Sequence, residues 1–222
     1  METFPSTIPI SMVGDVRNNV LTLKSRSESQ KLFTRRTGGQ FWSFTIKMPP
    51  LKADEFAAFE AFTLRQNGGA EPFQIVLPHR KLARGVATGT PLVNGGAKAG
   101  ATVVYVDGFT PGITSIMMEG DIIKFGSHSK VYTNLYNVTS AADEALQTET
   151  GEDLITEASE VILLESSNQA MLTIWPPLVQ DVPDNDTVTV NGVPFTVVMT
   201  TPIYSISAPN IYATELDMEE DF

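Results

Sequence analysis

Histidine is scarce in this chain, which limits the acid–base and metal chemistry that it could perform. Only His79 and His128 have side chains that titrate near neutral pH. Two histidines are too few for most histidine-based catalytic or zinc-binding arrangements. His128 lies between two serines, but a nucleophile and its base must converge in space, which neighbours on one turn rarely do. There is no cysteine, and hence no thiolate ligand, cysteine nucleophile or disulfide. The sequence therefore predicts neither an enzyme nor a bound cofactor.

Two other segments have residue types that could bind an ion or a phosphate. Asp181, Asp184, Asn185 and Asp186 offer oxygen ligands suited to calcium, but the cluster lacks the glycine and the distal glutamate of an EF-hand loop. A solvated turn is the favoured interpretation. The glycine-rich stretch NGGAKAG has no Ser or Thr after Lys98, so it does not match a phosphate-binding loop. No metal or phosphate site is predicted.

The most clearly marked elements are a strand, a helix and a strand between residues 41 and 78. Apolar residues first alternate with polar ones, which is the period of a strand with one buried face. From about residue 52 to 66 the spacing becomes that of a helix with one core-facing stripe, and Asn67-Gly68-Gly69 is a typical helix end. A short apolar strand follows at 73–77. The residues predicted to pack in the core or at an interface are Trp42, Phe44, Ile46, Phe56, Phe59, Phe62 and Trp175.

Charge is distributed unevenly along the chain. The net charge is -11, but residues 1–85 have 12 basic and 7 acidic residues, or +5, and the remainder has 3 basic and 19 acidic residues, or -16. This asymmetry indicates two differently charged modules. A nucleic-acid groove is disfavoured, because the acidic half would repel phosphate and exposed aromatics are not interleaved with the basic residues. A basic surface that meets an acidic partner is preferred. Its predicted members are Arg35, Arg36, Arg80, Lys81 and Arg84.

The second half of the chain has the pattern of a small β-domain. Short apolar or β-branched runs at 102–106, 122–125, 130–138, 161–164 and 171–175 are separated by turns such as Asp107-Gly108, with no room for a crossover helix. The acidic stretch 141–157 is either a short surface helix or a loop. Asn191-Gly192 between apolar runs predicts a hairpin, and the acidic tail TELDMEEDF would normally be disordered in isolation.

The sequence predicts neither a membrane-spanning helix nor an N-terminal secretory signal. No apolar run approaches the roughly 18 residues that a membrane-spanning helix needs. The N-terminal stretch METFPSTIPISMVGD lacks a basic start and a sustained apolar core, so it does not match a secretory signal. We expect no membrane association.

Several motifs together carry a resemblance to a known family. They are GGQFWSFTIKMPPLKADEFAAFEAFTLRQNGGAEPFQIVLP, GVATGTPLVNGGAKAGATVVYVDGF, MMEGDIIKFGSHSKVYTNLYNV and LTIWPPL. The chain resembles, over residues 38–180, the distal tail proteins of tailed bacteriophages, especially the short two-domain members. The resemblance implies a structural virion protein at the tail tip or baseplate, in which a tail-tube-like β-sandwich or barrel core with one helix forms a ring, usually of six subunits.

The resemblance also implies partners and a domain layout. The expected partners are other copies of the chain, the tail tube protein, baseplate hub or tail tip proteins and the tape measure protein. Residues 1–84 and 178–222 would form the ring core, and 85–177 an inserted small β-barrel of the oligonucleotide/oligosaccharide-binding type. The predicted fold class is mainly β with one packed helix. Two alternatives stay open: another tail connector, such as a terminator or completion protein, and a carbohydrate-binding module that uses Trp42, Trp175 or tyrosines.

Overall fold

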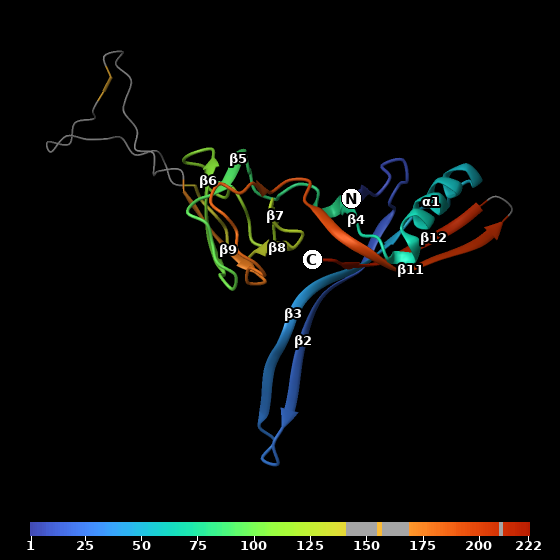
Figure 1. The fold of residues 1–222 in the computed structure, drawn as a ribbon, viewed down its shortest axis with the longest axis horizontal. Coiled ribbons are helices and arrows are strands. Elements are labelled where there is room, and N and C mark those ends of the chain that lie inside the picture. Colours follow the sequence, from blue (N-terminus) through green and yellow to red (C-terminus); the bar gives the residue numbers. More distant parts are fainter. Residues whose placement is uncertain (141–154, 157–168, 209–210) are drawn as a thin grey trace. The chain divides into compact units, whose positions relative to one another are not determined.

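The structure is a computed structural model that describes residues 1–140, 155–156, 169–208 and 211–222. Strands predominate in it, and one α-helix packs on a sheet, which confirms the predicted mainly β fold with one packed helix (Figure 1). The chain divides into two compact units. Residues Met1–His79 and Pro194–Phe222 form the first unit, and Arg80–Val193, inserted between them, form the second unit.

The first unit is built on one six-stranded sheet with the strand order β1-β4-β11-β12-β3-β2. All neighbouring strands in it are antiparallel except β1 and β4, which pair in parallel. The two C-terminal strands lie in the middle of the sheet, between β4 and β3, so the first unit cannot form without its C-terminal part. The strands are β1 (Glu2–Thr3), β2 (Met12–Arg26), β3 (Leu32–Lys47), β4 (Phe73–Val76), β11 (Pro194–Ala208) and β12 (Ile211–Glu220).

Helix α1 (Ala53–Arg65) supplies the second layer of the first unit, where a sandwich would have a second sheet. At its start the Lys52 N–H donates to Glu55 Oε2 (3.0 Å), which satisfies one of the amides that a helix leaves open. At its end, the short 3₁₀ turn η1 (Asn67–Gly69) has Gly69 at a φ of 94°, and a Cβ there would lie 2.1 Å from the Met199 carbonyl oxygen. Glycine is therefore required both by conformation and by close packing. The turn η2 (Pro78–Arg80) leads out of the first unit.

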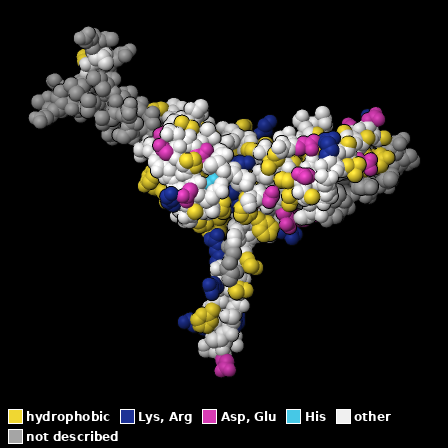
Figure 2. Space-filling model, viewed as in Figure 1, with side chains coloured by type: hydrophobic (Ala, Val, Ile, Leu, Met, Phe, Trp, Pro, Cys, Tyr) yellow, Lys and Arg dark blue, Asp and Glu magenta, His cyan; other side chains and the backbone are white. Residues whose placement is uncertain are grey.

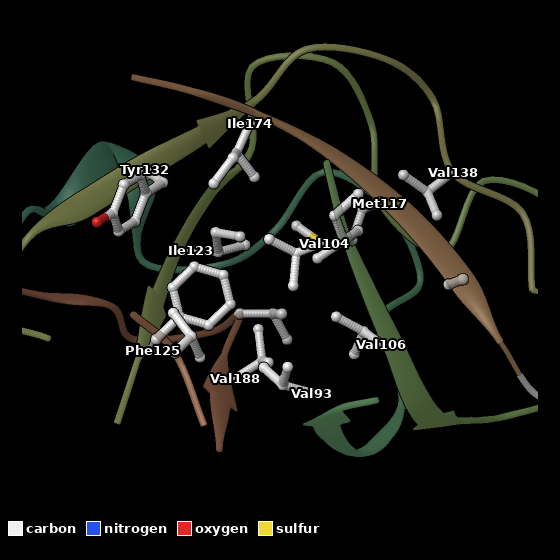
Figure 3. Packing of buried hydrophobic residues seen from close by; sticks show 14 of the residues in the cluster. Val93, Val104, Val106, Met117, Ile123, Phe125, Tyr132, Val138, Ile174 and Val188 are labelled. Carbon is white, nitrogen blue, oxygen red and sulfur yellow. The ribbon is translucent and has the colours of Figure 1, made fainter. Parts of the chain in front are cut away.

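The second unit is a nearly closed antiparallel barrel with the strand order β10-β7-β8-β9-β6-β5. A bridge between Leu92 and Thr187 joins its two ends. Val104, Ile123 and Phe125 point with other apolar side chains into the interior (Figure 3). The expected small β-barrel is therefore present. Its strands are β5 (Gly89–Val93), β6 (Val103–Phe109), β7 (Ile122–Phe125), β8 (Val131–Asn134), β9 (Ala170–Trp175) and β10 (Val188–Thr189).

Two glycines allow a bend in this barrel where the sequence predicted a turn. Asp107-Gly108 lies inside β6, next to a register shift between β5 and β6. Gly89 and Gly108 have φ values of 107° and 75°, and a Cβ on Gly89 would lie 2.2 Å from the Gly108 carbonyl oxygen. The dipeptide forms an irregularity within a strand instead of ending it.

The second domain boundary lies at Val193, and the prediction of a boundary after residue 177 was wrong. Residues 178–193 stay with the barrel because Leu178, Val182, Val188 and Val190 are buried in its core. The first boundary lies at His79, a few residues before the predicted position.

The C-terminal segments also pair differently from the prediction. β10 pairs with β7 in the barrel and β11 pairs with β4 in the sheet, so Asn191-Gly192 connects the two units and is not a hairpin turn. A hairpin is instead formed by β11 with β12, and β12 pairs with β3 in the sheet. The acidic tail, expected to be disordered in isolation, is strand β12. The predicted strand at 161–164 and, apart from 155–156, the acidic stretch 141–157 lie outside the described residues.

Candidate functional site

The most unusual surface of the first unit is the two-stranded ribbon formed by β2 and β3, which leaves the sheet and extends alone (Figure 1). Residues 21–26 and 31–36 are exposed on both faces of the ribbon. Four of them are large and apolar: Leu21, Leu23, Leu32 and Phe33 are 64%, 59%, 50% and 51% exposed. Hydrophobic and basic side chains follow the ribbon along its length in Figure 2. We call residues 20–36 the arm.

The pairing register gives the two faces of the arm different compositions. Residues paired across an antiparallel ladder lie on the same face. Lys24 pairs with Thr34, Arg26 with Leu32, and Thr22 with Arg36, so one face has three cations. We call it the cationic face. The opposite face has Leu23 paired with Arg35 and Ser25 paired with Phe33, and the Lys31 ammonium lies 5.5 Å from the centre of the Phe33 ring.

An acidic hollow lies on the sheet face opposite α1, at the base of the arm. Glu215, Asp217 and Glu219 of β12 pair with Lys47, Thr45 and Ser43 of β3, while Leu216 and Met218 between them are buried. The hollow is lined by Asp15, Arg17, Ser43, Phe44, Thr45, Thr200, Asp217, Met218 and Glu219.

The carboxylates of this hollow outnumber its cations. Asp15, Asp217 and Glu219 face one guanidinium, that of Arg17, which lies 3.8 Å from Asp15 at a highly exposed position. The Thr45 hydroxyl donates to Asp217, and Glu215 next to the hollow pairs with Lys47 (3.0 Å). The sequence interpretation missed this site because it treated the C-terminal acids as a tail. The alternation of acids with Leu216 and Met218 was the available signal for a strand with an acidic face.

The predicted core residues of the first unit are buried. The Phe62 ring of α1 contacts that of Phe73 in β4 (5.1 Å between centres), which joins the helix to the sheet, and within the sheet the Phe44 ring contacts that of Phe195 (5.5 Å). Trp175, in the second unit, is partly exposed at the end of β9. The exposed fractions of the others are 8% for Trp42, 2% for Phe44, 0% for Ile46, 8% for Phe56, 1% for Phe59 and 0% for Phe62. Trp42 therefore has no free ring face with which to stack on a sugar.

The five predicted members of a basic surface do not belong to one unit. Arg35 and Arg36 are exposed on the arm, whereas Arg80, Lys81 and Arg84 belong to the barrel unit. Burial lowers the pKa of Arg80 below its ordinary value. The Arg84 guanidinium donates to the Glu119 carbonyl oxygen (3.1 Å), so this side chain braces the barrel.

The glycine-rich stretch at 94–100 and the aspartate cluster at 181–186, considered above as possible ion sites, form hydrogen bonds with each other. The Gly95 N–H donates to Asp184 (2.8 Å), and the Ala99 N–H donates to Asp181 (2.9 Å). The Lys98 ammonium also donates to Asp181 (2.7 Å), and this bond followed by that of Ala99 lowers the pKa of the Asp181 carboxyl. Asp186 instead accepts hydrogen bonds from Ser127. The carboxylates of Asp181, Asp184 and Asp186 thus each accept a backbone N–H at a different point of the barrel unit, and they do not converge on one ion site.

His128 is buried in the barrel unit. Its Nδ1 lies 2.8 Å from Tyr132 Oη, and its Nε2 lies 3.4 Å from the Asp181 carbonyl oxygen. The Phe125 ring packs edge-on against the imidazole. Burial lowers the pKa of His128 below its ordinary 6.5, against smaller opposing effects of the Asp181 carbonyl and the Asp186 carboxylate. The imidazole is a neutral packing element.

This burial predicts an acid-labile barrel unit. Because the folded pKa of His128 is lowered, the unfolded chain binds more protons than the folded chain as the pH falls through about 6.5, and the free energy of unfolding decreases. We expect the urea midpoint of the second unit to fall between pH 7.5 and pH 5.5, and His128→Gln to reduce this dependence. His79→Gln, at an exposed site in the first unit, is the control. An unchanged dependence in His128→Gln would contradict the assignment.

Among the described residues, no three His, Cys, Asp or Glu side chains converge in a geometry that could hold a metal ion. Within the same part of the chain, no helix has the length and apolar character needed to cross a bilayer.

No model of a known protein family matches the sequence, and a search of curated proteins gives no match either.

Proposed function

We propose that this chain is a structural virion protein of a phage tail tip or baseplate. In this role it forms a ring, of six subunits by the resemblance described above, that joins the tail tube to the baseplate hub or tip. Its partners are other copies of itself, the tail tube protein, hub or tip proteins and the tape measure protein. It catalyses no reaction.

The observation that carries this proposal is the uncovered arm of the first unit. Residues 43–47 of β3 pair with β12 in the sheet, so the ribbon extends beyond the sheet by residues 32–42 of β3, which is roughly 36 Å. A two-stranded ribbon has little stability of its own in water, and a long edge strand such as β2 invites pairing with another chain. Four exposed large apolar side chains add to the cost of leaving the arm in solvent. These features are those of an assembling protein.

The remaining architecture is consistent with a ring subunit. A sheet with an arm at one edge presents different surfaces to its two neighbours, which is the heterologous contact from which rings close. The barrel unit has its own core and is inserted between two segments of the first unit, so it can be present without interrupting the sheet. A terminator or completion protein would not require this second unit.

The proposal predicts where and in what number the chain is found. Virions of the phage whose genome encodes it should contain about six copies per tail, and gold-labelled antibodies should mark the tail tip in electron micrographs. The tail tube protein of the same genome, labelled with a second gold size, is the control for position. Absence of the chain from purified virions, or labelling along the whole tube, would overturn the proposal.

A further inference from the structure

The arm and the acidic hollow have opposite charges and lie in the same unit. The arm has five basic residues and one acid, Glu28, for a net charge of +4, so the other residues sum to -15 within a total of -11. Neither Lys24 nor Arg26 forms an ion pair with any described residue of the chain. The hollow has three carboxylates and one guanidinium. Each surface has the charge that the other needs.

One chain cannot bring these two surfaces together. β3 runs without interruption from Thr34 on the arm to Ser43 in the hollow, and at 3.3 Å per residue this is about 30 Å of strand. The partner strand β2 pairs along most of this length, which keeps the ribbon extended. A contact between arm and hollow therefore requires two molecules.

We propose that the cationic face of the arm docks in the acidic hollow of a second copy of this chain. Lys24, Arg26 and Arg36 meet Asp15, Asp217 and Glu219 of the neighbouring copy, and Leu32 on the same arm face is covered by the contact. Each copy gives one arm and receives one arm, so the contact is heterologous and repeats until a ring closes. The inference rests on the proposed ring assembly and names the surfaces that form it.

The docking predicts charge-reversed variants that fail alone and assemble together. Lys24→Glu with Arg26→Glu reverses the charge of the cationic face, and Glu219→Lys with Asp15→Asn reverses the charge of the hollow. Asn suits position 15 because Asp15 has a φ of 48°, a conformation that Asn tolerates. In each variant like charges meet, so we expect the concentration for half-assembly, measured by mass photometry, to rise about tenfold or more. An equimolar mixture should form mixed rings of alternating copies near the wild-type concentration.

A matched control changes the same charge on the other face of the arm. Lys31→Glu with Arg35→Glu alters residues beside Phe33, so assembly should remain close to that of the wild type. Raising the salt concentration should weaken wild-type assembly, since exposed charges are screened.

The outcomes separate this inference from the proposed function. A wild-type chain that stays monomeric at micromolar concentration would contradict ring assembly itself. Wild-type rings that both reversed variants still form, or a mixture that does not recover, would overturn only the docking of the arm in the hollow. Equal loss in the control variant would overturn the assignment to the cationic face. If the Lys24→Glu, Arg26→Glu variant lost DNA binding but formed unchanged rings, the partner of the cationic face would be nucleic acid and the docking proposal would be overturned.

Discussion

Replacing Phe59 with Asp should prevent the first unit from folding. Phe59 is 1% exposed in the stripe of α1 that packs on the sheet, with its ring 6.3 Å from that of Phe56. Removing a buried Phe side chain alone costs about 3–5 kcal/mol, and a carboxylate in its place has no cation to pair with in an apolar core. The sum is comparable to the whole stability of a domain, about 5–15 kcal/mol. Fluorescence of Trp42 in a Trp175→Phe background would report on the first unit.

Leu64→Asp is the matched control for this substitution. Leu64 lies in the same helix but is 72% exposed, so an added carboxylate stays in water and the first unit should fold. Assembly should be lost in Phe59→Asp together with folding, because the arm depends on the sheet. A folded, soluble monomer of Phe59→Asp would show that the stripe is an interface between molecules and not a core.

Local signals in the sequence were sufficient for α1 and its surroundings. The helix was expected at about 52–66 and is found at Ala53–Arg65. The prediction succeeded because the spacing of the Phe residues and the Asn-Gly-Gly helix end depend only on residues close together in the sequence. The strand with Trp42 and Ile46 was predicted by alternation in the same way. In these segments the local preference and the tertiary packing agree.

Where the prediction failed, the deciding contacts are between residues distant in sequence. The local sequence around Val182 and Val188 would suit either unit. Only the burial of these side chains in the barrel core decides on which side of the boundary they lie. Asn-Gly favours a tight turn but cannot say which strands its flanks will join. Asp15 and Asp217 come from opposite ends of the chain, so no local pattern could place them in one hollow. Leu23 alternates like a buried strand residue yet is exposed on the arm.

Asp121→Ala should strongly destabilise the barrel unit. Asp121 is 4% exposed, and its carboxylate accepts backbone N–H bonds from Arg84 (2.9 Å) and Met118 (2.8 Å), with Gly85 at 3.4 Å. These bonds tie the segment that enters the barrel to the turn before β7. Alanine leaves the donors without this acceptor at a partly buried site, at about 1–3 kcal/mol for each group that water cannot reach. We expect a loss of about 3 kcal/mol or more in urea unfolding followed by Trp175 fluorescence in a Trp42→Phe background.

Glu119→Ala gives the same change in charge two residues away and separates this structural role from a general electrostatic effect. The Glu119 side chain is exposed, and only its carbonyl oxygen accepts a bond from Arg84, which the substitution retains. Its effect should stay within about 0.5 kcal/mol, as for most surface positions. Equal losses in the two variants would mean that the negative charge of the turn matters and the buried hydrogen bonds do not. A larger loss in Asp121→Ala would assign the stability of the barrel entrance to one carboxylate.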